Sequence, residues 1–212
     1  MIIEKSGDVL RSNALIIAHQ VNCTGVMGAG IAKQIRSRML TNKSFLKYKY
    51  LCKEEGLYLL GSCLLLPRKD KEGRYIANLF GENIPTGKKL DTEYKFLFKS
   101  FQDLRRKILL RKEISPSSRI TIAIPAYLGC GLAGGDWEIV FSRILLPLFQ
   151  NSEETLIIYY LPESANRLWK EFRKIPVNAE NGCIEKGWHG FTPGTGVGCI
   201  YKWFDETFPE YF

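Results

Sequence analysis

Short runs of consecutive apolar residues, rich in β-branched and aromatic side chains, constrain the fold of this chain more than any other feature. They recur along the 212 residues at positions 14–18, 62–66, 75–80, 120–124 and 156–160. Runs of this length, apolar on both sides, are typical of central strands that helices cover on both faces. The pattern predicts a layered domain built on a largely buried sheet.

Amphipathic stretches separate these runs. The spacing of their apolar residues predicts helices that open near position 29, that include positions 45–51, and that span 92–111, 137–149 and 163–173. Asp136, just before Trp137, is typical of an N-cap residue. Because strands alternate with helices, we expect an α/β fold, with three α/β/α layers around a mixed, mostly parallel central sheet.

The length favours one domain, which we place at residues 1–174. The composition changes beyond it, because residues 175–212 hold many glycines and few regular patterns. We expect this part to be a C-terminal extension packed on the core, ending in a short amphipathic helix that buries Ile200, Trp203 and Phe204. Binding of a partner by that aromatic face is the alternative.

The chain carries 30 Lys and Arg against 22 Asp and Glu, a formal charge of +8. This excess predicts attraction to anions, and a diphosphate, a nucleic-acid backbone and mere solubility all fit it. The positive residues are spread along the sequence, which favours an ordinary solvated surface. Weak nucleic-acid contact through the basic surface remains the alternative.

Membrane and metal binding are not predicted. No apolar run approaches the roughly 20 residues that cross a bilayer, and the first residues are typical of a strand rather than a signal peptide. We therefore expect a cytoplasmic protein with no membrane partner. The six cysteines form no CxxC pair and only two histidines accompany them, so we expect reduced thiols and no metal site.

The first segment that suggests chemistry, residues 19–33, follows a predicted strand and opens a predicted helix. Such a turn, here with Gly25, Gly28 and Gly30, lets backbone N–H groups and the positive helix end approach a phosphate. In open α/β sheets, ligands bind beyond the carboxyl ends of strands. The spacing matches neither GxGxxG nor GxxxxGK[ST], so a purely structural turn is the alternative.

The second such segment, residues 125–137, also lies between a strand and a helix. Its core, Gly-Cys-Gly-Leu-Ala-Gly-Gly at 129–135, indicates positive φ angles or close approach by another group. Two loops of this kind at strand ends can close on a diphosphate from both sides. Together they predict a phosphate-bearing ligand.

Both segments resemble the two ligand loops of macrodomains, through His-Gln-Val-Asn-Cys-Thr-Gly-Val-Met-Gly-Ala-Gly-Ile-Ala at 19–32 and Leu-Gly-Cys-Gly-Leu-Ala-Gly-Gly-Asp-Trp at 128–137. The segments at 6–10 and 73–81 add to the resemblance, which covers roughly residues 1–172. The similarity is to the branch of the terminal ADP-ribose glutamate hydrolase, the DNA-thymidine ADP-ribose antitoxins and the yeast ADP-ribose-1″-phosphate phosphatase. It implies a macrodomain fold that binds ADP-ribose without a cofactor or metal.

The resemblance also implies roles for individual residues. Asp8 would accept from the adenine amino group beside the Val9 N–H, although an aspartate after glycine is also a common turn or cap residue. Asn22 would hydrogen-bond the distal ribose, or simply end a strand. The distal ribose and diphosphate would be cradled by Gly28, Gly30, Ile31, Gly129, Gly131, Leu132 and Ala133. His19, Tyr127 and Cys130 complete the ligand-binding set, although the position of His19 favours a core histidine.

The resemblance identifies the catalytic residues less directly than the ligand-binding residues. In the glutamate hydrolase relatives, a lysine after the central strand attacks or stabilises the anomeric carbon, and an acid directly after Gly-Cys-Gly-Leu assists it. Here Lys88 and Lys89 are the candidate lysines, but Ala133 stands where the acid is expected and Asp136 is the first acid beyond it. The residues themselves favour an N-cap for Asp136 and solvated charges for the lysines. Asn22 is the remaining catalytic candidate.

The resemblance implies hydrolysis of an ADP-ribose conjugate, attached to a protein or to a nucleic acid. Rigid binding of the diphosphate and preorganised electrostatics would supply much of the rate. Two alternatives stay open: phosphatase action on ADP-ribose-1″-phosphate, and a reader that binds ADP-ribose without turnover. The absence of an acid at Ala133 favours both.

Overall fold

The computed structural model describes residues 1–87, 90–110 and 120–161. The strands are β1 (Ile2–Ser6), β2 (Ile16–Asn22), β3 (Cys63–Pro67), β4 (Tyr75–Glu82), β5 (Thr121–Pro125) and β6 (Thr155–Tyr160). The longer helices are α1 (Gly30–Met39), α2 (Asn42–Glu55) and α3 (Tyr94–Leu110). A further helical run joins α4 (Trp137–Ile139), a π-helical turn (Val140–Leu145) and α5 (Leu146–Phe149), and short 3-10 turns cover Val9–Arg11 and Gly56–Leu59.

The strands form a single six-stranded sheet in the order β1-β6-β5-β2-β4-β3. All neighbouring strands are parallel except the pair β3 and β4, which is antiparallel. The predicted mixed, mostly parallel sheet is confirmed. Every predicted apolar run overlaps a strand, although β2 begins only at Ile16. Both β2 and β4 continue to Asn22 and Glu82, beyond the apolar residues that suggested them.

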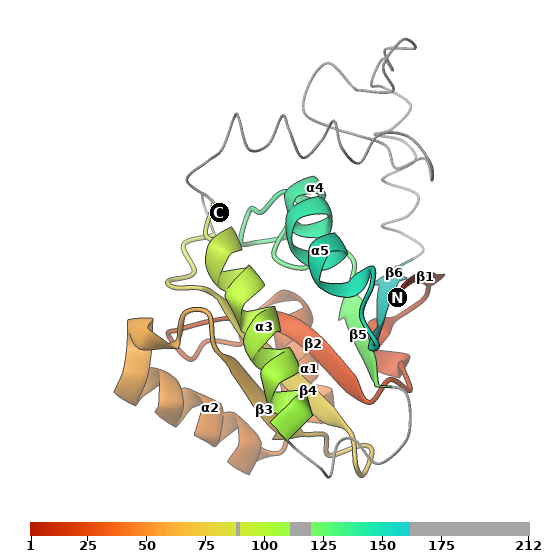
Figure 1. Ribbon diagram of the computed structural model, residues 1–212. Helices are drawn as coiled ribbons and strands as arrows, with labels where there is room; N and C mark the ends of the chain where they lie inside the picture. The colour runs from red at the N-terminus through yellow and green to blue at the C-terminus, as the bar shows by residue number, and fades with distance from the viewer. Residues whose placement is uncertain (88–89, 111–119, 162–212) are drawn as a thin grey trace.

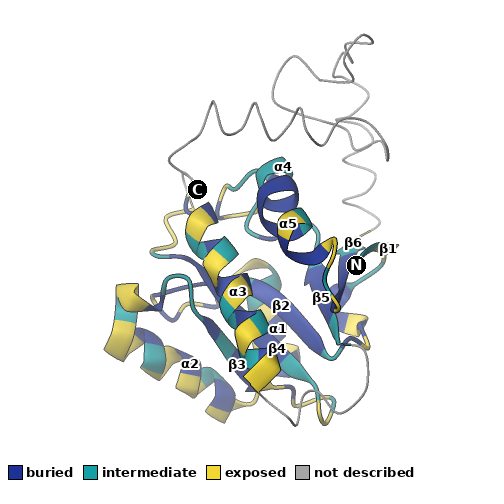
Figure 2. Cartoon of the chain, in the orientation of Figure 1, coloured by how far each residue is buried: buried dark blue, intermediate teal, exposed yellow. Residues whose placement is uncertain are grey.

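Helices cover both faces of the sheet, as the three layers in Figure 1 show. On one face, α3 and the run from α4 to α5 pack Leu97, Phe101 and Ile144 against the strands. On the other face, α1 and α2 contribute Ile35 and Tyr48 to a second apolar cluster. In Figure 2 the central strands are buried, whereas the outward side of α2 is exposed. This arrangement confirms the predicted fold class.

Two neighbouring strands send the chain to opposite faces. After β2 the chain enters α1, which packs on one side of the sheet, and after β5 it enters α4, which packs on the other. A crevice opens between such diverging connections, and ligands of α/β proteins bind there. Within the described residues, no helix is long and apolar enough to cross a membrane. The predicted helix at 163–173 and the predicted extension at 175–212 lie outside the described residues.

Candidate functional site

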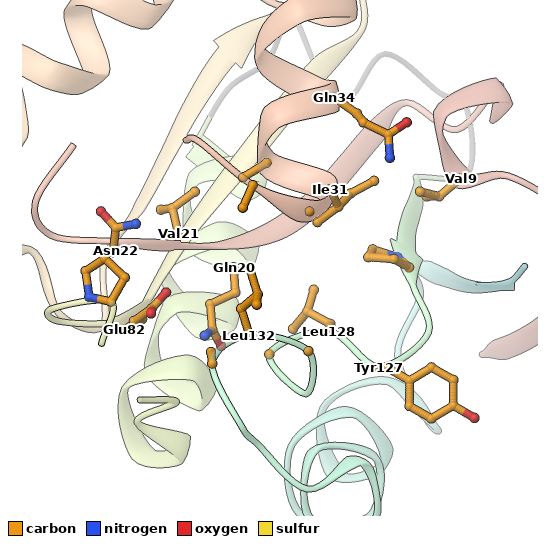
Figure 3. A pocket seen from close by; sticks show the side chains of 18 of the residues that line it. Val9, Gln20, Val21, Asn22, Ile31, Gln34, Glu82, Tyr127, Leu128 and Leu132 are labelled. Atoms are coloured by element: carbon orange, nitrogen blue, oxygen red, sulfur yellow. The ribbon is translucent and has the colours of Figure 1, made fainter. Parts of the chain in front are cut away.

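A cleft of about 450 Å³ lies at this divergence, within the size range of small-molecule sites. Figure 3 shows Val9 at one end and Asn22 with Glu82 at the other, while Gln20 and Leu132 lie between them. Both glycine-rich loops contribute to the walls. The cleft therefore brings together residues from the first turn of the chain, the end of β2 and the loop after β5.

The loop after β2 is held by the side chain of Asn22. Its Oδ1 accepts hydrogen bonds from the Thr24 N–H at 3.2 Å and the Val26 N–H at 3.1 Å, and its Nδ2 donates to the Val26 carbonyl at 2.8 Å. The Tyr48 hydroxyl of α2 donates to the Asn22 carbonyl at 2.8 Å. Asn22 lines the cleft, but most of its hydrogen-bonding capacity shapes the loop.

The loop after β5 makes hydrogen bonds with the segment that precedes α3. Thr92, just before α3, donates from its hydroxyl to the Gly129 carbonyl at 2.6 Å and accepts from Gln20 Nε2 at 3.0 Å. The Ala133 carbonyl accepts from the backbone N–H groups of Asp91 and Thr92 at 2.8 and 3.1 Å. Gly129 has φ of +77°, and a Cβ there would stand 2.6 Å from Gln20 Oε1, so both the backbone conformation and the packing favour glycine.

The far end of the cleft is built around the first 3-10 turn. Asp8 caps this turn, with Oδ1 accepting from the Leu10 N–H at 2.9 Å. Both Asp8 and Val9 line the cleft, and Tyr127 lies across from them with its ring packed against Trp137 and Tyr160. The cap uses one carboxylate oxygen, which leaves the other for a donor in the cleft.

Most of the predicted ligand-binding residues line this one cleft. They are Asp8, Val9, Asn22, Gly28, Gly30, Ile31, Tyr127, Gly129, Gly131, Leu132 and Ala133.

His19 and Cys130, the other two predicted ligand-binding residues, do not line the cleft. His19 is fully buried and its Nε2 lies 2.9 Å from Asn78 Oδ1 on β4. Burial lowers its pKa to about 4, so the imidazole is neutral. The Cys130 thiol donates to the Leu128 carbonyl at 3.3 Å within its own loop, and burial raises its pKa.

Asp136 caps the helix that begins at α4, because its Oδ1 accepts from the Glu138 N–H at 2.8 Å. It does not line the cleft, and its role as a catalytic acid stays a prediction. The other two catalytic candidates, Lys88 and Lys89, lie outside the described residues. No group of His, Cys, Asp and Glu suited to a metal ion occurs in the described ranges.

Sequence reasoning missed Gln20 and Glu82. Gln20 lines the cleft next to the buried His19, and Glu82 closes the end beside Asn22. Glu82 is 9% exposed, and its burial, followed by the nearby charge of Asp91, raises its pKa to about 7. Gln20 lies at the start of the first glycine-rich segment, 19–33, but was not singled out there, and Glu82 lies outside both segments. The only sequence sign of Glu82 was its place after the apolar run at 75–80.

The macro domain family model matches residues 18–144, more than half of the chain. The chain therefore belongs to the macro domain family, and the predicted resemblance is confirmed. The fold agrees: the macrodomain of Mycobacterium tuberculosis DarG superposes with a TM-score of 0.61 at 29% identity, over 75% of this chain and 97% of that one. The macrodomain of Thermus aquaticus DarG has a TM-score of 0.60 at 23% identity.

Two curated proteins show related sequences. The DNA ADP-ribosyl glycohydrolase of Mycobacterium tuberculosis is 32% identical over 170 residues, 79% of this chain. The ADP-ribose 1″-phosphate phosphatase of Saccharomyces cerevisiae is 38% identical over 76 residues, 35% of this chain. The matched regions span only 44% and 42% of these two relatives, less than half of either protein.

Proposed function

We propose that this protein binds ADP-ribose in the cleft and hydrolyses an ADP-ribose conjugate. The observation that carries the proposal is the order of groups along one cleft. The Asp8 carboxylate lies at one end, two glycine-rich loops flank the middle, and Asn22 and Glu82 lie at the other end.

This order matches the order of chemical groups in ADP-ribose. The free oxygen of Asp8 suits the adenine amino group, which donates hydrogen bonds. The diphosphate fits between the start of α1, at Gly30 and Ile31, and the loop at 129–133, where backbone N–H groups are available to an anion. The distal ribose then lies at Asn22, with its C1″ atom towards Glu82.

The first substrate class to test is an ADP-ribosylated nucleic acid. The name of the mycobacterial relative, the net charge of +8 and the basic outer side of α1 and α2 support this choice. These two helices expose Lys33, Arg36, Arg38, Lys43, Lys47, Lys49 and Lys53. Lys49 of α2 packs against Gly25 of the loop after β2, which places one of these basic residues beside the first glycine-rich loop. ADP-ribosylated protein is the second class of conjugate.

The phosphatase alternative is supported by the 38% identity to the yeast enzyme. A reader without turnover is the non-enzymatic alternative, and the alanine at position 133 favours it. The cytoplasmic location and a catalytic lysine at position 88 or 89 stay predictions.

Calorimetry followed by turnover assays tests the proposal. We expect ADP-ribose to bind with Kd of about 1 µM, equivalent to about −8 kcal/mol, and AMP to bind much more weakly because it lacks the second phosphate and the distal ribose. Turnover is then measured on ADP-ribosylated DNA, an ADP-ribosyl-glutamate peptide and ADP-ribose-1″-phosphate. Equal affinity for AMP and ADP-ribose contradicts the binding mode, and ADP-ribose binding without turnover leaves a reader.

A further inference from the structure

Glu82 holds a distinctive place at the end of the cleft where the distal ribose is proposed to lie. It is the last residue of β4 and pairs with Asn22 of β2 across a bulge in the sheet. Its carbonyl accepts from the Cys23 N–H at 3.1 Å, which ties this strand end to the first glycine-rich loop. Figure 3 shows the side chains of Glu82 and Asn22 at the same end of the cleft.

No basic side chain among the described residues lines the cleft, and the acids that line it there are Asp8 and Glu82. Val9, the neighbour of Asp8 in the chain, lies at the opposite end of the cleft from Glu82. Asn22 uses its amide to hold its own loop, and Asp136 caps a helix away from the cleft. Within the described part of the chain, Glu82 is therefore the titratable side chain positioned at the ribose end.

The groups that surround Glu82 are acidic or neutral. Asp91 comes from the segment before α3, Cys23 from the loop after β2 and Tyr48 from α2. Glu93 and Cys52 are neighbours of Cys23 in turn. Burial raises the pKa of Cys23 to about 12 and raises the pKa values of Tyr48 and Cys52, so these groups are neutral. The Asp91 carboxylate accepts from the Thr86 N–H and the Gly87 N–H at 2.7 and 2.8 Å, bonds that stabilise its negative charge.

In this environment the Glu82 carboxyl holds its proton more tightly than an ordinary glutamate. Burial contributes most and the Asp91 charge second, and together they raise the pKa of Glu82 to about 7. Near neutral pH both its forms are populated, which is the condition under which a general acid or base works best.

We propose that Glu82 is a catalytic acid–base residue that accepts the proton of the water attacking C1″, an inference that rests on the proposed hydrolysis. The water oxygen forms a bond to C1″ while the bond from C1″ to the leaving group breaks, and that electron pair goes to the leaving group. The water proton passes to the Glu82 carboxylate. Glu82 then releases it to the leaving group or to solvent, so its starting form returns and ADP-ribose is the product.

The test compares Glu82→Gln with Glu93→Gln. The second variant removes a nearby but exposed carboxylate that does not line the cleft. In wild type, kcat/KM should rise with pH to a plateau above about 7, because the basic form of Glu82 is the active one. Glu82→Gln should lose about 100-fold or more in turnover and should lose this pH dependence, while ADP-ribose affinity at pH 6 changes less than about threefold. Glu93→Gln should retain the turnover and the pH dependence of wild type.

Proton uptake provides a second measurement that needs no turnover. The negative diphosphate makes ionisation of Glu82 harder, so wild type should take up part of a proton when ADP-ribose binds near pH 7.5. Calorimetry in buffers of different ionisation enthalpy measures this uptake. Glu82→Gln should show much less of it than wild type and Glu93→Gln.

The outcomes separate the two proposals. If wild type turns over a conjugate and Glu82→Gln matches it in rate and pH profile, the role of Glu82 is wrong while the proposed function stands. If wild type binds ADP-ribose but turns over no conjugate, the proposed hydrolysis and the catalysis by Glu82 are both wrong. Loss of turnover, pH dependence and proton uptake in Glu82→Gln alone supports the inference.

Discussion

The two glycine-rich loops that wall the cleft are stabilised in different ways. The loop after β2 is organised from within, because Asn22 bonds to the backbone of Thr24 and Val26. The loop after β5 combines internal backbone hydrogen bonds, such as that from the Gly135 N–H to the Gly129 carbonyl, with a side-chain hydrogen bond from Thr92, which Gln20 holds in place. It packs so closely that a Cβ on Gly129 would displace Gln20. One loop therefore depends on a particular side chain, and the other depends on the absence of one.

The largest expected effect is that of Gly129→Ala. Its new Cβ would lie 2.6 Å from Gln20 Oε1 and 3.0 Å from Thr92 Oγ1, at φ of +77°. We expect a loss of about 1–3 kcal/mol in the free energy of unfolding from overpacking, and a loss of at least about 100-fold in ADP-ribose affinity, equivalent to about 2.8 kcal/mol. Thermal melts and calorimetry measure the two effects.

Gly131→Ala is the control for this variant within the same loop. A Cβ there meets no atom within 4 Å, so its unfolding should match wild type. If Gly129→Ala also melts like wild type and binds ADP-ribose normally, the close packing does not hold the second loop.

Asn22→Ala should have the next largest effect, because it removes the internal hydrogen bonds of the first loop. We expect ADP-ribose affinity to fall by about tenfold or more, the equivalent of about 1.4 kcal/mol, together with turnover. Asn42→Ala, at an exposed asparagine of α2, is the matched control. Lower turnover with unchanged affinity would instead assign Asn22 to the reacting ribose and not to the shape of the loop.

Asp8→Asn extends the comparison to the end of the cleft proposed to bind adenine, where one side chain caps the 3-10 turn and would also contact the ligand. Asparagine caps a helical turn about as well as aspartate, so folding should be unchanged. The amide nitrogen cannot accept from adenine, and we expect a loss of about 1–3 kcal/mol in ADP-ribose binding. The preference should shift towards the hypoxanthine analogue, whose oxygen accepts from that nitrogen. Binding of both ligands as in wild type would leave Asp8 as a cap only.

The smallest effect is expected for Asp136→Asn, where the second loop leads into α4. Because the cap is retained, stability, affinity and turnover should stay close to those of wild type. Asp136→Ala should cost about 1 kcal/mol of stability without affecting the cleft directly. A large loss of turnover in Asp136→Asn, with a normal thermal melt, would support Asp136 as a catalytic residue.

The pH dependence of stability checks the environment of Glu82 in the absence of ligand. Its folded pKa of about 7 lies above its ordinary value of 4.5. The folded protein therefore binds the Glu82 proton more tightly than the unfolded chain does. The resulting contribution to the free energy of unfolding is fully present below pH 4.5 and is lost as the pH rises to about 7. The difference in Tm between Glu82→Gln and wild type should therefore depend on pH, and it should favour the variant more at pH 8 than at pH 4. An equal difference at both pH values would contradict the raised pKa.

The sequence by itself determined the fold class and the two loops, because both depend on local patterns. Apolar runs and helical spacing along the chain indicate strands and helices wherever the chain is packed in layers. Glycine clusters mark the turns that need positive φ, as at Gly25 and Gly129. The strand ends of β2 and β4 were placed too early, because apolar character stops before the hydrogen-bonded ladder does.

Only the tertiary structure decided which side chains face the cleft. Successive side chains of a strand point to opposite faces, so the choice between His19 and Gln20 depended on the neighbours of β2, where Asn78 pairs with the histidine. The environment of Glu82 likewise depends on Asp91 and on burial between β2 and β4. A raised pKa arises from desolvation and from charges close in space, and neither can be read from the order of residues along the chain.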